Sequence, residues 1–164
     1  MRDDQITARR LRELLHYDPA TGIFTNIAPR KKVVVGSVAG SLDASTGYWM
    51  IGLDRRRYYA HRLAWLYMTG EWPAQLIDHL DGDRTNNVFA NLRDAERAIN
   101  QQNMRRPLPG TASGLLGAFK KRNKWTSNVR AFGQIIRLGT FDTAEEAHAA
   151  YLQAKRKYQP GCTI

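Results

Sequence analysis

Residues 76–83 are Leu76-Ile77-Asp78-His79-Leu80-Asp81-Gly82-Asp83, a short apolar run that ends in an acid beside an imidazole and continues as a polar turn. The asparagines that follow include those at positions 87, 91, 100 and 103. A carboxylate can hold a hard divalent cation, and an adjacent imidazole can take a proton from water near neutral pH. Amide oxygens can complete a metal shell or orient the ring. The stretch therefore predicts a hydrolytic metal site of the kind that cleaves a phosphodiester.

The whole chain is strongly basic. It has 164 residues, of which 43% are hydrophobic, and its formal net charge is +10. This length and composition allow one ordinary domain or two small ones with a packed core. The charge favours a nucleic acid or an anionic membrane as partner.

Hydrophobicity and cysteine content reduce the possible partners and cellular compartments. No apolar run reaches the ~18 residues that span a bilayer, and residues 1–5 do not resemble a secretion signal. We therefore expect no membrane partner. Cys162 is the single cysteine, which excludes an intrachain disulfide and a cysteine zinc cluster and fits a reducing cytoplasm.

Charge is unevenly distributed along the chain. Residues 1–76 carry 11 basic and 7 acidic side chains, residues 77–104 carry 3 and 5, and residues 105–164 carry 11 and 3. The net values are thus +4, −2 and +8. An acidic pocket between two basic segments would hold a cation where the flanks bring phosphates.

Turn residues and periodicity predict the elements of the first part. Thr7 can cap a short helix with Leu11, Leu14 and Leu15 on one face, before a turn at residues 18–22. Short strands are expected at residues 23–25, 33–35 and 48–53, and a helix at residues 61–69 that Gly70 ends. A further helix is expected from Asp94, its cap, to about Met104, with Asn100 in its middle.

Residues 105–114 contain two prolines and two glycines, and we expect a linker there. Three strands are expected after it, at residues 116–121, 124–130 and 134–140. The sequence Thr143-Ala144-Glu145-Glu146 predicts a capping box at the start of a final helix that covers one face of the sheet. The other face is then open to bind a partner.

The segment from Ile77 to Asn103 resembles the HNH, or ββα-metal, nuclease motif, and closely the form found in phage homing endonucleases. Asp78-His79 corresponds to the end of the first strand of that motif, Asn91-Leu92-Arg93 to the start of the second, and Asn100 to the helix. Residues 60–65 and 70–73 are similar to the lead-in of this group. The resemblance covers residues 7–103.

This resemblance implies roles for individual residues. It makes His79 the general base that activates water, Asp78 and Asn100 the metal ligands, and Asn91 the residue that braces the loop and orients the imidazole. Many relatives in the wider superfamily have His where this chain has Asn100, and an amide ligand favours Mg²⁺ or Mn²⁺ over zinc. We expect one such ion per active site and no small-molecule cofactor.

Plainer interpretations exist for several of these residues. The cluster could be a turn whose Asn and Asp side chains cap backbone groups, although such a turn does not require His79. Asn87 could shape the loop or contact the DNA backbone. His61 could be a second catalytic imidazole, but its position before an apolar helix is typical of a partly buried histidine. Arg55, Arg56 and Arg57 could form a solvated charge run, and we favour contact with phosphates.

Residues 115–158 resemble the APETALA2 or ethylene-response-factor DNA-binding domain, most specifically from Leu138 to Ala147. The resemblance implies that the sheet lies in the major groove with the helix behind it. Alternation along the strands independently sorts the two faces. Residues 125, 127, 129, 136 and 138 are expected to face the helix. The outward, DNA-facing residues are expected to be Phe119, Lys121, Thr126, Asn128, Arg130, Ile135 and Arg137.

The sequence as a whole predicts an α+β protein with an N-terminal helix and small β-sheet region, a ββα-metal motif, and a three-stranded antiparallel sheet on one helix. The expected domains are a nuclease domain (1–104, motif core 76–104), the linker (105–114) and a DNA-binding domain (115–164). The predicted activity is site-selective nicking of double-stranded DNA by a phage homing-type enzyme in the cytoplasm of a bacterial host. The alternatives are a DNA-binding regulator without catalytic activity and an RNA-binding protein.

Overall fold

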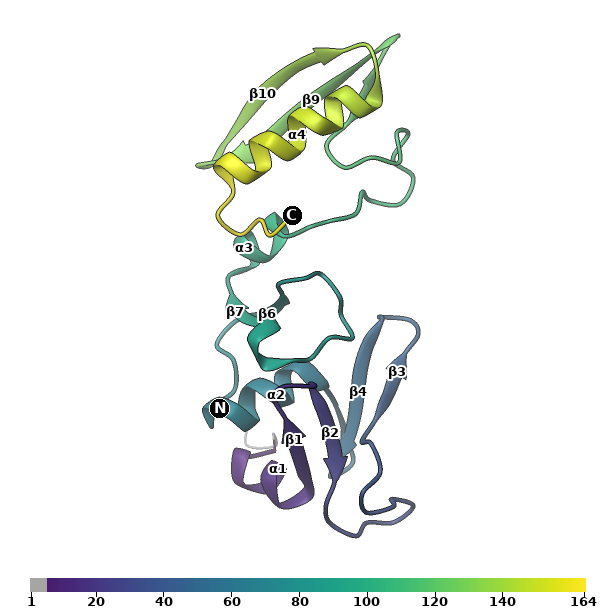
Figure 1. Cartoon of the computed structure of the whole chain (residues 1–164), viewed down its shortest axis with the longest axis vertical. Coiled ribbons are helices and arrows are strands. Elements are labelled where there is room, and N and C mark those ends of the chain that lie inside the picture. The colour runs from purple at the N-terminus through teal and green to yellow at the C-terminus, as the bar shows by residue number, and fades with distance from the viewer. Residues whose placement is uncertain (1–5) are drawn as a thin grey trace. The chain divides into compact units, whose positions relative to one another are not determined.

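The computed structural model describes residues 6–164, apart from the side chains of residues 97 and 98. The chain forms two compact units, one ending at Ala95 and the other comprising Glu96–Ile164, and each is described by itself. Both combine short helices with small antiparallel sheets (Figure 1), which confirms the predicted α+β class.

Unit 1 begins with helix α1 (Ala8–Leu14) and the hairpin of β1 (Leu15–Asp18) and β2 (Ile23–Asn26). Thr7 caps α1 as predicted, since its hydroxyl accepts a hydrogen bond from the backbone N–H of Arg10 at 3.1 Å. Leu15, expected on the helix, starts β1 and is fully buried there. The hairpin turn contains Gly22 at φ +73°.

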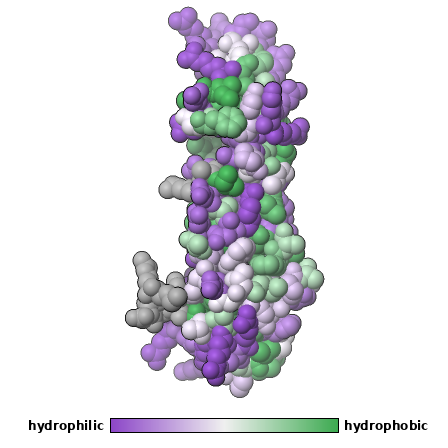
Figure 2. Space-filling view, turned by 90° about the vertical axis from the view of Figure 1, so that its left-hand side faces the viewer, coloured by the Kyte–Doolittle hydropathy of each residue, from purple (hydrophilic) through white to green (hydrophobic). Residues whose placement is uncertain are grey.

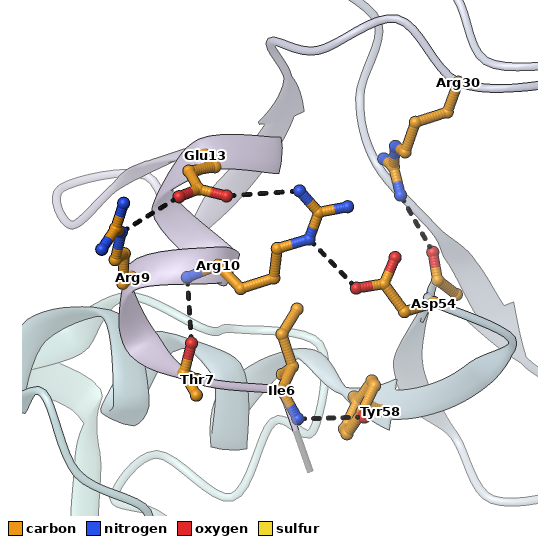
Figure 3. Close-up of polar contacts among 9 residues, drawn as sticks. Ile6, Thr7, Arg9, Arg10, Glu13, Arg30, Asp54 and Tyr58 are labelled. Carbon is orange, nitrogen blue, oxygen red and sulfur yellow. Dashed lines mark hydrogen bonds and ion pairs between the residues drawn. The ribbon is translucent and has the colours of Figure 1, made fainter. Parts of the chain in front are cut away.

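Polar contacts orient α1 against the rest of unit 1 (Figure 3). The guanidinium of Arg10 lies between Glu13 and Asp54, 3.2 Å from an oxygen of each. The Tyr58 hydroxyl accepts a hydrogen bond from the backbone N–H of Ile6 at 3.3 Å. Exposed ion pairs add little stability, so these contacts mainly set the direction of α1.

A three-stranded antiparallel sheet follows, with strand order β3 (Ser41–Asp43), β4 (Tyr48–Leu53), β5 (Arg56–Tyr59). Helix α2 (Ala60–Thr69) continues directly from β5 and buries Leu63, Ala64 and Leu66. Gly70 ends α2 in the left-handed conformation at φ +84°, and its N–H donates to the Leu66 carbonyl at 2.9 Å. This helix and its end are as predicted.

The remaining elements of unit 1 are the hairpin of β6 (Leu76–His79) and β7 (Leu92–Ala95), with the 3₁₀ turn η1 (Phe89–Asn91) before β7. A two-stranded hairpin is marginally stable by itself. Ile77 and Leu92 anchor it, because both are buried in the core of unit 1. That core also contains Leu11, Leu14, Leu15, Tyr17, Phe24, Ile51, Leu53, Leu63 and Leu66.

The strand predicted at residues 33–35 is wrong. This segment forms turns, with a single bridge between Arg30 and Val33, and Val34 is 73% exposed. β-branched residues favour strands where they pack on a half-buried pleated surface, whereas Val34 and Val35 are exposed.

The helix predicted to start at Asp94 is also wrong at its beginning. Asp94 lies in β7, opposite Ile77, and its carboxylate accepts hydrogen bonds from the backbone N–H groups of Ala74 and Gln75 at 3.0 and 3.1 Å. Strand pairing with β6 therefore takes precedence over capping, and α3 (Arg97–Gln102) starts three residues later.

Unit 2 contains α3, the antiparallel sheet of β8 (Phe119–Lys121), β9 (Lys124–Ala131) and β10 (Gln134–Phe141), and helix α4 (Ala144–Tyr158). The strand order is β10-β9-β8. The predicted capping box is present, since the Thr143 hydroxyl accepts from the Glu146 N–H and the Glu146 carboxylate accepts from the Thr143 N–H. Ser127 and Val129 are buried and Trp125 packs against the small core, as predicted.

Within the described residues, no helix is both long enough and apolar enough to cross a bilayer. Figure 2 shows hydrophilic and hydrophobic residues mixed in small groups over one face of the molecule.

We expect Gly117→Ala to lower the free energy of unfolding by about 2 to 4 kcal/mol, because Gly117 has φ +75° and an added Cβ would lie 2.0 Å from Cγ of Tyr151. Gly133→Ala is the control, since Gly133 has φ +74° but nothing lies within 4 Å of the added atom. Urea unfolding followed by circular dichroism measures both losses. Equal losses for the two variants would contradict the close contact with Tyr151.

Candidate active site

His79 ends β6 and lies in a buried ring cluster. Its side chain is 4% exposed, and its ring meets that of His61 edge-on, with centroids 5.1 Å apart. The Tyr48 ring lies 5.0 Å from His61 and 6.0 Å from His79, so it packs against both imidazoles. Burial of Ile77 on the same strand holds β6, and with it His79, in place.

A hydrogen bond orients the His79 ring. Nε2 of His79 lies 3.3 Å from Oδ1 of Asn87. The Asn87 amide nitrogen donates to the Thr85 carbonyl at 3.1 Å, which turns Oδ1 toward the imidazole. An amide oxygen accepts hydrogen bonds only, so this arrangement assigns the proton to Nε2 and the lone pair to Nδ1 in the neutral ring.

Electrostatics favour that neutral form. Burial lowers the pKa of His79, while the hydrogen bond that His79 donates to Asn87 and the nearby Asp81, Asp78 and Asp83 act in the opposite direction. A neutral imidazole can accept a proton, so His79 is in the form that a general base requires near pH 7.

The sequence predicts Asn87 as a DNA contact, whereas the structure buries its side chain to 4% exposure against His79. The Tyr17 hydroxyl donates to the Asn87 carbonyl at 2.6 Å. Gly22 also closes on this segment, because a Cβ at Gly22 would lie 2.4 Å from the carbonyl carbon of Asn87. The β1–β2 hairpin thus sets the position of Asn87, and spacing within the motif gives no signal of that contact.

Asn91 braces the loop between β6 and β7. Its amide oxygen accepts from the Asp81 N–H at 3.0 Å, and its amide nitrogen donates to Asp81 Oδ1 and to the Asn86 carbonyl at 2.9 Å each. Asn86 in turn donates to Asp81 Oδ2 at 2.6 Å. These contacts brace the loop through Asn91, and the hydrogen bond of the His79 ring described above is to Asn87.

Asp78 is a buried carboxylate beside His79. It is 6% exposed and pairs with Arg93, whose Nη2 lies 2.5 Å from Asp78 Oδ2 across the β6–β7 ladder. A carboxylate has about four acceptor positions, so Asp78 can bind a cation and Arg93 together. Its chemistry therefore fits a hard divalent ion.

Asn100, the other predicted ligand, is half-buried on α3 in unit 2. In the part of the chain that the structure describes, no three His, Cys, Asp or Glu side chains are grouped to hold a metal. This criterion does not apply to a site made of one carboxylate, such as Asp78, and one amide oxygen, such as that of Asn100. The ligand roles of Asp78 and Asn100 stay predictions.

His61 is buried in the first turn of α2 and stacks on Tyr59, with ring centroids 5.3 Å apart. Its Nδ1 is buried without a hydrogen-bond partner among the described residues. Burial, together with the charges of His79 and Arg62, lowers the pKa of His61 from 6.5 to about 3. His61 is therefore a neutral aromatic wall of the cluster at pH 7, in keeping with the expected partly buried histidine.

The predicted DNA contacts occupy two regions. Arg55 lies in the β4–β5 turn at φ +65°, and Arg56 and Arg57 start β5. In unit 2, Phe119, Asn128 and Arg130 line a cavity of about 520 Å³ together with residues of the segment 104–117. Among the predicted outward positions, Phe119, Lys121, Arg130, Ile135 and Arg137 are exposed, and Thr126 and Asn128 are half-buried.

Residues 58–102 match the family model described as HNH endonuclease. The matched segment contains α2, the β6–β7 hairpin and α3, and hence His61, Asp78, His79, Asn87 and Asn100. The match supports an HNH nuclease acting on DNA, and nucleases of this family generally depend on a divalent metal ion. Neither the curated proteins nor the solved structures include a match to the chain.

We expect Gly22→Ala to disturb the His79–Asn87 hydrogen bond, because the added Cβ meets the Asn87 backbone. Nitrogen-15 NMR of the imidazole should show protonated Nε2 in the wild type and a mixture of tautomers in the variant. Gly36→Ala is the matched control, since Gly36 also has positive φ and nothing lies within 4 Å of its added Cβ. A Gly22→Ala spectrum identical to that of the control would contradict this support of Asn87.

The low pKa of His61 makes stability depend on pH. The unfolded chain binds a proton below about pH 6.5 and folded His61 does not until about pH 3, so stability is lost as pH falls through this window. Between pH 7 and 5.5 we expect the free energy of unfolding to fall by about 1 kcal/mol from His61. His61→Phe should flatten the profile in urea unfolding, and exposed His16→Phe should not. An unchanged profile for His61→Phe would contradict the burial of a neutral ring.

Proposed function

We propose that the chain is a divalent-metal-dependent endonuclease that nicks double-stranded DNA, in the manner of phage homing enzymes. The proposal rests on one observation. Buried Asp78 and neutral, oriented His79 are adjacent on β6, within the segment that matches the HNH endonuclease family. Mg²⁺ or Mn²⁺ is the proposed ion.

His79 acts as the general base in this proposal. With Asn87 accepting from Nε2, the lone pair of Nδ1 takes the proton of the attacking water. Asp78 and Asn100 would hold the ion, which supplies charge stabilisation at the phosphate and the leaving oxygen. Arg93 pairs with Asp78 and fixes the direction of its carboxylate.

The C-terminal sheet selects the DNA in this proposal, with the linker 105–114 joining the domains 1–104 and 115–164. Its outward side chains suit duplex DNA, because Arg130 and Arg137 can bind guanine or phosphate and Asn128 can pair with adenine. Phe119, Lys121, Thr126 and Ile135 complete that face. One active site per chain suits a nick in a single strand.

Supercoiled plasmid incubated with the protein and Mg²⁺ should be converted to open circles, and EDTA should prevent the conversion. We expect His79→Ala to slow nicking by a factor of roughly 10² to 10⁴, since general base catalysis contributes about that much. His16→Ala, an exposed histidine of the same unit, is the control and should nick at the wild-type rate.

Equal nicking by His79→Ala and the wild type would contradict the catalytic role of His79. Tight DNA binding without nicking under any divalent ion would instead favour the DNA-binding regulator. If structured RNA displaced duplex DNA in a gel-shift competition and the converse failed, the RNA-binding alternative would hold.

A further inference from the structure

An open pocket of about 340 Å³ lies at the edge of the sheet in unit 1, where β5 is the last strand. We call it the arginine pocket. Its lining residues come from β5, α2 and the segment after α2, and they are Arg56, Arg57, Tyr58, Tyr59, Arg62 and Trp72. Three arginines and three aromatic residues therefore line one open pocket.

Among the described residues, the charges of Arg57 and Arg62 have only weak acidic compensation. Arg57 is 3.8 Å from Asp43, but its side chain is 62% exposed, so this ion pair is weak. Arg62 is half-buried, and burial lowers its pKa against the opposing influence of Asp94. Cations that share a partly desolvated surface are costly unless an anion joins them. The pocket thus has the electrostatics of an anion site.

Arg62 is already held in position. Its Nη1 donates to the Gln75 carbonyl at 3.2 Å, and its guanidinium lies 5.7 Å from the centre of the Trp72 ring. Asp94 fixes Gln75 by accepting from its N–H. Trp72 is fixed by stacking on Tyr58. A guanidinium held in this way loses little freedom on binding, and its planar donors match two oxygens of a phosphate.

The pocket is also close to the candidate base. Tyr59 lines it and stacks on His61, whose ring meets that of His79. Two ring contacts therefore separate the pocket from His79. Successive nucleotides of one strand rise about 3.4 Å along the duplex. A strand whose cleaved phosphate lies at His79 therefore has other phosphates near the pocket within a few nucleotides.

We propose that the arginine pocket binds a phosphate of duplex DNA a few nucleotides from the cleaved one, with Arg62 as its main ligand. This inference rests on the proposed function. It adds Arg62, Tyr59 and Trp72 to the DNA contacts expected of Arg56 and Arg57, and it makes Arg62 a residue that positions the strand relative to His79.

The test uses a short duplex that contains one nick site mapped on plasmid DNA, with single phosphates replaced in turn by uncharged methylphosphonates. Binding is measured in EDTA with the His79→Ala chain and with the same chain carrying Arg62→Gln. We expect one or two neighbouring replacements to weaken binding about tenfold in the first chain and to have no further effect in the second. Arg62→Gln should also reduce the slope of log K against log salt by about 1.

Arg9→Gln is the matched control, because Arg9 is an arginine of unit 1 with a 90% exposed side chain, and it should keep the wild-type interference pattern. Arg57→Gln is a second pocket variant in case Arg62→Gln affects folding, which circular dichroism would reveal. In active chains, Arg62→Gln should raise KM with little change in kcat.

An interference pattern that is the same with and without Arg62 and Arg57 would overturn the pocket as a phosphate site. Failure of the proposed function is distinguishable, because the wild type would then not nick plasmid in Mg²⁺, and the same interference comparison would be made on a duplex selected by gel shift for binding to the wild type. Nicking by the wild type combined with unaltered binding by both pocket variants would remove the pocket proposal alone.

Discussion

The hydrogen bond between His79 and Asn87 depends on residues far from either in the sequence. Tyr17 binds the Asn87 carbonyl, and the turn at Gly22 lies against the same backbone without room for a side chain. Asn87 can therefore present its oxygen to the imidazole only while the β1–β2 hairpin is in place. The tautomer of His79, and with it the nitrogen that can act as a base, follows from this packing.

Burial and charge act together in this region. Asp78, His79, His61 and Asn87 all have less than a tenth of their surface exposed, which is unusual for polar side chains. Asp78 pairs with Arg93, His79 and Asn87 bind each other, and His61 is neutral because burial lowers its pKa. The Nδ1 atom of His61 is buried without a hydrogen-bond partner among the described residues. Neutral imidazoles avoid the larger cost of buried cations, and they leave the net charge of the site to the acidic residues around it.

Features that depend on neighbouring residues could be predicted from the sequence. The cap at Thr7, the end of α2 at Gly70, the capping box at Thr143 and the alternation along β9 are all local, and the structure has them. The pair Asp78 and His79 was also identifiable, since both sit in one short strand. Val33–Val35 and Asp94 were mispredicted because their state depends on which strand, if any, pairs beside them.

The partner of His79 could not be predicted for a related reason. Asn87 is eight residues away across a loop whose path is set by Tyr17 and Gly22, and polar loops admit many side-chain arrangements. The ring cluster of Tyr48, His61 and His79 joins three segments in the same way. Residue types and spacing indicated a candidate site, whereas tertiary packing selected which amide orients His79.

The contacts of the β1–β2 hairpin with Asn87 indicate that the segment matched by the nuclease family does not form its site independently of the rest of unit 1. Residues 58–102 contain both members of the hydrogen-bonded pair, but Tyr17, Gly22 and Tyr48 lie outside them. The N–H of Phe89 also binds the Pro19 carbonyl at 3.2 Å. An excised or transplanted segment would keep every motif residue and lose the scaffold that aligns them. In this chain the motif residues alone therefore do not fix the arrangement of His79 and Asn87, which also requires residues outside the matched segment.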